Sequence, residues 1–158
     1  MKRIILIIAL GLMGATALQA QDYNWAIGLR GGGMTTNLTV KHKVAEGRAL
    51  EFAGSYWYAG RGAILTGLME WSTPVITDGF DLYYGIGAHL GTGIYENEGT
   101  STAKFVIGVD AVVGLEYKVP RAPIAFSLDY RPFLHILSTE ASKMLGLYDI
   151  GLGVKFCF

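Results

Sequence analysis

The chain has 158 residues, of which 51% are hydrophobic and only 16% are charged, and its formal net charge is zero. This length suits a single domain, and the charged share is below the roughly 25% that is usual in soluble proteins. The lack of a basic excess excludes a surface that recruits nucleic acid, and the single cysteine, Cys157, excludes an intramolecular disulfide and a cysteine zinc site.

The first twenty residues predict a secretory signal peptide. A basic pair at residues 2–3 precedes a short apolar run at residues 4–13, and small residues follow. This pattern allows cleavage after Ala17 or after Ala20. Without the basic pair, 11 of the 13 basic residues remain against 13 acidic residues, which gives a net charge of −2. We therefore expect an exported mature domain that spans residues 21–158.

The rest of the chain alternates between apolar and polar residues, which is the period of β-strands. Glycine-rich or polar stretches divide it into eight predicted strands. They span residues 23–32, 35–44, 50–57, 63–72, 82–95, 105–119, 124–133 and 148–158. Polar loops are expected at residues 96–104 and 137–145. No helical period, linker or second domain is evident, and no apolar run reaches the 18 or so residues of a membrane-spanning helix.

The charged residues of these strands fall on one face. In the clearly alternating segments they lie opposite the apolar residues, and they are Arg30, Glu51, Glu70, Asp110, Glu116, Lys118, Asp129, Arg131, Asp149 and Lys155. A Lys or Arg that faced lipid at the middle of a bilayer would cost about 2–4 kcal/mol. The apolar face should therefore lie outside and the charged face inside. We expect an all-β protein, an eight-stranded antiparallel up-and-down transmembrane β-barrel whose lumen is filled by a charge network.

Aromatic residues are expected near both ends of this barrel. One end would carry Tyr23, Trp25, Trp71, Tyr84, Tyr117, Phe126, Phe156 and Phe158, and the other would carry Tyr56, Phe105, Tyr130 and Tyr148. Two aromatic girdles, one at each interface, are typical of membrane barrels.

The last predicted strand has one wholly apolar face and ends on an aromatic residue. This face carries Tyr148, Ile150, Leu152, Val154, Phe156 and Phe158. Its pattern resembles the C-terminal sorting signal of bacterial outer-membrane β-barrels. The resemblance implies that the barrel-assembly machinery recognises these residues during biogenesis.

Almost the whole mature chain resembles the small eight-stranded outer-membrane barrels of the OmpA/OmpX type, which are porin-family outer-membrane proteins. The segments at residues 67–71, 83–89 and 114–120 carry this likeness. It implies a location in the outer membrane of a Gram-negative envelope, in contact with outer-membrane lipid and lipopolysaccharide. The outer loops are shorter than those of many such barrels, which argues against the role of an adhesin or phage receptor.

Together these features predict a structural or surface-interaction role, with no enzymatic activity, cofactor or metal, and with a surface partner that the sequence does not identify. A narrow channel for ions or small solutes through the charged lumen is one alternative. A lipid A-modifying enzyme is another, because His135 lies near Ser138, Thr139 and Glu140 in the expected last outer loop. The three histidines are scattered along the chain and do not predict a metal site.

Overall fold

The structure is a computed structural model that describes residues 23–75, 79–97, 100–137 and 145–158. The described residues form the strands β1 Trp25–Gly32, β2 Thr35–Ala45, β3 Arg48–Trp57, β4 Gly62–Pro74, β5 Phe80–Asn97, β6 Thr100–Lys118, β7 Ile124–Tyr130, β8 Phe133–Leu137, β9 Leu145–Gly146 and β10 Ile150–Cys157. Within these ranges, no helix has the length and hydrophobicity needed to cross a membrane.

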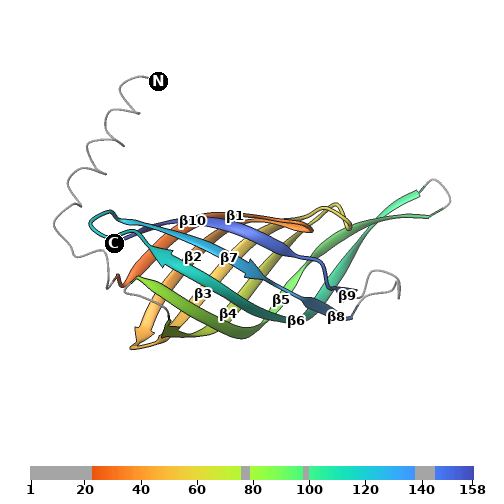
Figure 1. Cartoon of the computed structure of the whole chain (residues 1–158). Helices are drawn as coiled ribbons and strands as arrows, with labels where there is room; N and C mark the ends of the chain where they lie inside the picture. The colour runs from red at the N-terminus through yellow and green to blue at the C-terminus, as the bar shows by residue number, and fades with distance from the viewer. Residues whose placement is uncertain (1–22, 76–78, 98–99, 138–144) are drawn as a thin grey trace, which may run out of the picture.

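The strands form one closed antiparallel barrel (Figure 1). Each strand from β1 to β6 pairs with the next along the chain, β6 pairs with β7, β7 pairs with β10, and β10 pairs back with β1. Strand β8 extends the line of β7 and pairs with β9, which precedes β10. Because β7 with β8 and β9 with β10 each form one interrupted strand of the wall, the ten strands correspond to eight strands of the barrel. The prediction of an eight-stranded antiparallel barrel is confirmed.

The seventh and eighth strands of the wall are each interrupted, for different reasons. Between β7 and β8, Pro132 has no N–H to donate to the ladder, yet the register against β6 is unchanged on both sides of it. Between β9 and β10 the chain contains one residue too many for a regular ladder. Leu147 and Tyr148 are consequently both exposed, and Asp149 points into the barrel, as expected at a β-bulge.

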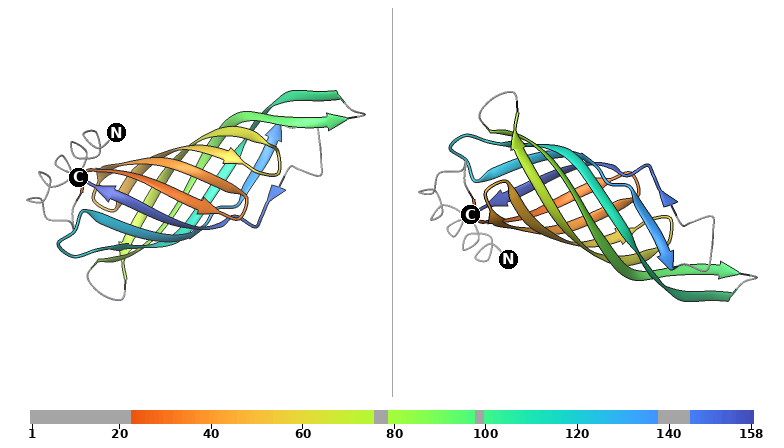
Figure 2. Two further views of the ribbon diagram at one scale, coloured as in Figure 1. Left: turned by 90° about the horizontal axis from the view of Figure 1, so that it is seen from above. Right: turned by 90° about the horizontal axis from the view of Figure 1, so that it is seen from below.

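The hairpin of β5 and β6 is longer than the sequence predicted. The expected polar loop at residues 96–104 is wrong, because β5 continues to Asn97 and β6 begins at Thr100. The paired strands project beyond the other hairpins of the barrel, which the views in Figure 2 show from two sides. The connection between these two strands is therefore shorter than predicted, and the strands themselves are longer.

The barrel has its apolar residues outside and its charges inside. Many large side chains on the outer face are exposed, from 36% at Met69 to 63% at Ile86 and 68% at Leu152. Alternate residues on the same strands are buried, so the predicted assignment of faces holds on every long strand. This distribution is the reverse of a soluble barrel.

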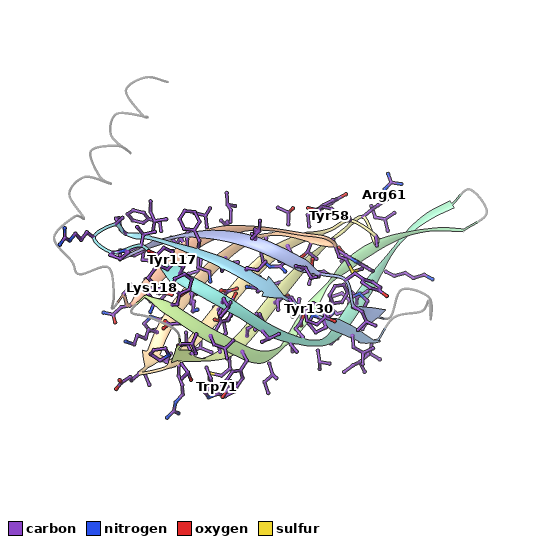
Figure 3. The ribbon with its side chains drawn as sticks, in the orientation of Figure 1. Tyr58, Arg61, Trp71, Tyr117, Lys118 and Tyr130 are labelled. Carbon is purple, nitrogen blue, oxygen red and sulfur yellow. The ribbon has the colours of Figure 1, made fainter. Side chains whose placement is uncertain are left out.

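Of the aromatic residues labelled in Figure 3, Trp71 and Tyr117 lie towards the end that carries the C-terminus, and Tyr58 and Tyr130 lie towards the other end. Trp71 stacks on Tyr84 and Phe80 stacks on Tyr117 near the end that carries the C-terminus, whereas Tyr58 lies towards the other end. The prediction for Tyr23 is wrong. The chain bends at the following residue, and Tyr23 points into the lumen with 8% of its surface exposed.

Candidate functional site in the barrel interior

Nine charged side chains of the described residues lie inside the barrel with at most 8% of their surface exposed. Eight of them belong to the predicted set, and the ninth is Lys41. They are Arg30, Lys41, Glu51, Glu70, Glu116, Asp129, Arg131, Asp149 and Lys155. Together they form two connected groups, which we call the Arg30 group and the lysine group.

The Arg30 group joins β1 to the start of β10. Arg30 Nε donates to Asp129 Oδ1 over 2.6 Å, and Arg30 Nη1 donates to Asp149 Oδ2 over 2.9 Å. The Thr35 hydroxyl and the Met34 backbone N–H also donate to the Asp149 carboxylate, over 2.7 and 2.9 Å. The Asp149 carboxylate is therefore surrounded by donors from the first hairpin, which compensate for its burial.

The lysine group crosses the middle of the lumen. Lys155 Nζ donates to Glu116 Oε2 over 2.7 Å and lies 3.5 Å from Glu51 Oε2. Lys41 Nζ lies 2.9 Å from Glu70 Oε2 and 3.4 Å from the same Glu116 oxygen. Carboxylates from β3, β4 and β6 thus surround two ammonium groups from β2 and β10.

Arg131 connects the two groups. Its Nη1 lies 2.8 Å from Glu51 Oε1, and its Nε donates to Asp129 Oδ1 over 3.2 Å. Two tyrosines complete the contacts, since Tyr83 donates to Asp129 over 2.8 Å and Tyr23 donates to Glu116 over 2.6 Å. The result is a continuous set of ion pairs and hydrogen bonds across the lumen.

Inward-facing glycines leave the space that the long cations occupy. A Cβ atom on Gly28 would lie 2.6 Å from Lys155 Cγ, and one on Gly151 would lie 2.5 Å from Arg30 Cζ. Both distances are far below normal van der Waals contact. The glycine content of these strands is therefore a packing requirement of the charged interior.

Two residues of the predicted set lie outside this network. Lys118 pairs with Asp81 over 2.7 Å near the end of the barrel that carries the C-terminus. Asp110 Oδ2 lies 2.7 Å from His89 Nδ1, and His89 Nε2 lies 2.7 Å from His135 Nδ1. The sequence did not predict this chain of a carboxylate and two imidazoles.

His135 is not in an outer loop, so its predicted placement is wrong. It belongs to β8, is fully buried, and packs at 4.8 Å between ring centroids against Trp57. The alternation of β8 continues past Pro132, which carries His135 into the barrel. The other three residues of the enzyme hypothesis, Ser138, Thr139 and Glu140, lie outside the described residues.

Two empty spaces lie on either side of the charged network. The outer cavity has a volume of about 30 Å³, measured as the space that the centre of a water molecule can reach. Its lining includes His89, Asp110, Arg131 and Asp149. This is room for about two water molecules. At the other end is a polar vestibule of about 710 Å³, whose lining includes Tyr23, Lys41, Glu116 and Lys118. Within the described ranges, no group of three or more His, Cys, Asp or Glu side chains could hold a metal ion.

Sequence reasoning missed three members of the network. Lys41 was on the predicted inner face of its strand and could have been included on that ground. Tyr83 alternates with the outward Leu82 and was also open to prediction. The inward turn of Tyr23 depends on the bend after it, for which the alternating pattern offers no sign.

The apolar face of the last strand points away from the lumen. Ile150 and Leu152 are more than 60% exposed, and Val154 and Phe158 are each 45% exposed. Tyr148 lies in the bulge before β10 and is 83% exposed, whereas Phe156 is half-buried beside Phe158. The barrel closes where β1 pairs with β10, and one end of this seam is held by two backbone hydrogen bonds between Trp25 and Phe158, of 2.9 and 2.8 Å.

No protein-family model matches the chain, and no curated protein is significantly similar to it in sequence. Solved structures are similar in fold. The N-terminal β-barrel domain of Pseudomonas aeruginosa OprF aligns over 85% of this chain and 95% of its own length, with a TM-score of 0.68 and 12% identity. Neisserial surface protein A aligns over 85% of this chain and 93% of its own length, with a TM-score of 0.56 and 12% identity. At this identity the likeness concerns the fold, and the chain has the eight-stranded barrel fold of these two proteins.

Proposed function

We propose that the protein is an integral barrel of the bacterial outer membrane with a structural or surface-interaction role and a lumen closed by its charge network. One observation carries the proposal, namely the inverted distribution of side chains, with ion pairs inside and a continuous band of exposed Leu, Ile, Val and Phe outside. Soluble proteins rarely expose apolar patches larger than a few hundred Å². A hydrocarbon environment accommodates the whole band, and the aromatic residues near both ends suit the two interfaces.

The position of the network supports the proposal of a closed lumen. Lys41 and Glu116 line the vestibule, whereas Arg131 and Asp149 line the outer cavity. The side chains between them are paired at 2.6–3.5 Å. Moving a hydrated ion past them would require breaking buried pairs, each of which costs several kcal/mol to break.

The outer surface offers a place for interaction. The β5 and β6 hairpin extends past the end of the barrel wall, opposite the end where β10 finishes (Figure 1). In a membrane with both chain ends on the periplasmic side, this hairpin would face outward among lipopolysaccharide molecules. The apolar band would contact outer-membrane lipid, and β10 would be the strand presented to the barrel-assembly machinery.

A planar-bilayer recording of the refolded protein tests the closed lumen. The heat-dependent shift in gel mobility shows first that a barrel has formed. We expect no discrete conductance steps from the wild type, and steps from the double variant Lys155→Ala/Glu116→Ala, which removes the central pair. Arg121→Gln, in an exposed turn, is the matched control and should behave like the wild type. Discrete steps from the folded wild type would contradict the closed lumen and favour a channel.

We infer that the barrel does not modify lipid A through His135, because this side chain is buried and has no exposed surface for a substrate to reach. The His135→Ala variant, expressed in the outer membrane of a host whose own gene is deleted, tests this inference. The lipid A composition should be identical with the wild type, the variant and an empty vector. A species of lipid A that is present only with the wild type would contradict the inference.

A further inference from the structure

The charges of the enclosed network do not balance. Among the described residues that are at most 8% exposed, there are four cationic side chains, Arg30, Lys41, Arg131 and Lys155. The same set contains five carboxylates, Glu51, Glu70, Glu116, Asp129 and Asp149. An unpaired buried charge costs several kcal/mol, so one excess carboxylate calls for one further cation.

The neighbouring ion pairs do not supply that cation. Lys118 is committed to Asp81 at the rim of the vestibule, over 2.7 Å. The linked side chains of His89 and His135 have their own carboxylate, Asp110, which lies 2.7 Å from His89. Neither of these two pairs therefore supplies a positive charge to the network.

Four of the five carboxylates have strong compensation. Asp149 and Asp129 share the Arg30 guanidinium and accept further hydrogen bonds from hydroxyl groups. Glu116 accepts from Lys155 over 2.7 Å and from Tyr23 over 2.6 Å. The fourth, Glu51, has two cations beside it, namely Arg131 at 2.8 Å and Lys155 at 3.5 Å.

Glu70 is the least compensated carboxylate. It is 1% exposed, and Lys41 is its single cationic contact within 4 Å among the described residues. Lys41 also serves Glu116 at 3.4 Å. Neither oxygen of Glu70 accepts a hydrogen bond from a described residue, and the same holds for Glu51. The two differ in their cations, because Glu51 has one beside each oxygen and Glu70 has one beside Oε2.

We propose that the folded barrel binds one proton at Glu70, which carries it as a neutral carboxylic acid. With this proton the network holds four positive and four negative charges. A protonated carboxyl group also becomes a donor. Glu70 lines neither the outer cavity nor the vestibule, so the proton, which needs no coordination space, fits this position better than a metal cation.

The surroundings of Glu70 determine how the site responds to pH. From β2, β3 and β10, the charged groups that act on it are Lys41, Glu51 and Lys155, and Arg131 acts from the end of β7. Glu116 of β6 acts through the shared Lys41. The folded barrel would hold one proton more than the unfolded chain, in which a glutamate ionises near pH 4.3. The free energy of unfolding therefore falls as pH rises through the range in which that proton is retained.

Infrared spectroscopy of the barrel in lipid vesicles tests the proposal directly. A protonated carboxyl group absorbs apart from the carboxylate bands and shifts in heavy water. We expect this band from the wild type at neutral pH, its loss in Glu70→Gln, and its retention in Asp81→Asn, because Asp81 belongs to the rim pair with Lys118 and lies outside the network. A wild type without the band, or a band that survives in Glu70→Gln, would overturn the proposal.

Stability measurements give a second, independent outcome. Glu70→Gln imitates the protonated group, so its urea midpoint at neutral pH should equal or exceed that of the wild type. The fall of the midpoint at alkaline pH, which we expect for the wild type, should be absent from this variant. Glu116→Gln removes the carboxylate nearest to Lys155 and should lower the midpoint. If the urea midpoint falls by the same amount in Glu70→Gln and in Glu116→Gln, the proposal is overturned. The bilayer recordings do not bear on this result, because a conducting barrel could hold the same proton.

Discussion

Arg30 donates two hydrogen bonds to Asp149, one from Nη1 to the carboxylate over 2.9 Å and one from Nη2 to the main-chain oxygen over 3.0 Å. Arg30 belongs to β1, and Asp149 immediately precedes β10, so this pair spans the seam at which the barrel closes. Replacing Asp149 by Ala leaves a buried guanidinium with one fewer partner. We expect Asp149→Ala to lower the free energy of unfolding by about 3–5 kcal/mol, measured by urea titration in lipid vesicles.

The matched control for the seam pair is Asp81→Ala. Asp81 pairs with Lys118 at the rim, where both side chains retain more than a tenth of their surface. A partly solvated pair contributes about 0–1 kcal/mol. Equal losses in the two variants would show that enclosure does not strengthen the contribution of the seam pair.

The glycine against which the Arg30 guanidinium packs should not tolerate a side chain. In Gly151→Ala the new methyl group would meet a guanidinium that Asp129 and Asp149 hold in place. We expect a loss of about 1–3 kcal/mol, as is usual for overpacking. Gly54→Ala is the control, because nothing lies within 4 Å of the added carbon. If thermal melts place both variants at the wild-type midpoint, the interior is looser than these distances imply.

The hydroxyl group of Tyr23 should stabilise the barrel at its vestibule end. Tyr23→Phe keeps the buried ring but removes the donor that Glu116 accepts over 2.6 Å. Hydrogen bonds to charged groups contribute about 1.5–3 kcal/mol, so we expect a loss in that range in urea titrations. Tyr84→Phe, on the outer face, should leave the midpoint unchanged. If Tyr23→Phe has the same urea midpoint as the wild type, water replaces the hydroxyl group.

The outer face of β10 offers a test of assembly in cells. We expect Phe158→Asp to lower the amount of folded protein in the outer membrane, because it places a charge at the apolar end of the strand that we propose the assembly machinery recognises. Phe158→Trp keeps the aromatic character and should assemble normally. The measurement is the heat-shifted band in fractionated membranes. Wild-type levels of Phe158→Asp would remove Phe158 from the proposed assembly signal.

The faces of the strands could be predicted from the sequence because alternation is a local property. Each of Glu51, Glu70, Glu116 and Asp129 was placed on the inner face by its immediate neighbours alone. Which of them meet could not be predicted, because that depends on registers between distant strands. Lys41 and Glu116, for example, are 75 residues apart.

The errors arose where backbone geometry departs from regular alternation. The bend after Tyr23 reverses the face of that residue, and a change in direction of this kind leaves no trace in hydrophobicity. The seventh strand was predicted to end at residue 133, but the residues on both sides of Pro132 keep one register, and β8 continues to Leu137 and carries His135 inward. The polar residues at the tip of β5 and β6 suggested a loop, although a hairpin in solvent can be polar on both faces.

The seam between β1 and β10 affects the order in which the barrel can fold. The first strand finds its second partner only in the last strand, so the ladder stays incomplete until nearly the whole domain is present. Until then both edges of the growing sheet carry unpaired backbone groups beside an apolar face, which is the surface on which chains aggregate. Such non-local closure is slow. We therefore expect the chain to be more prone to aggregation before the seam closes than afterwards.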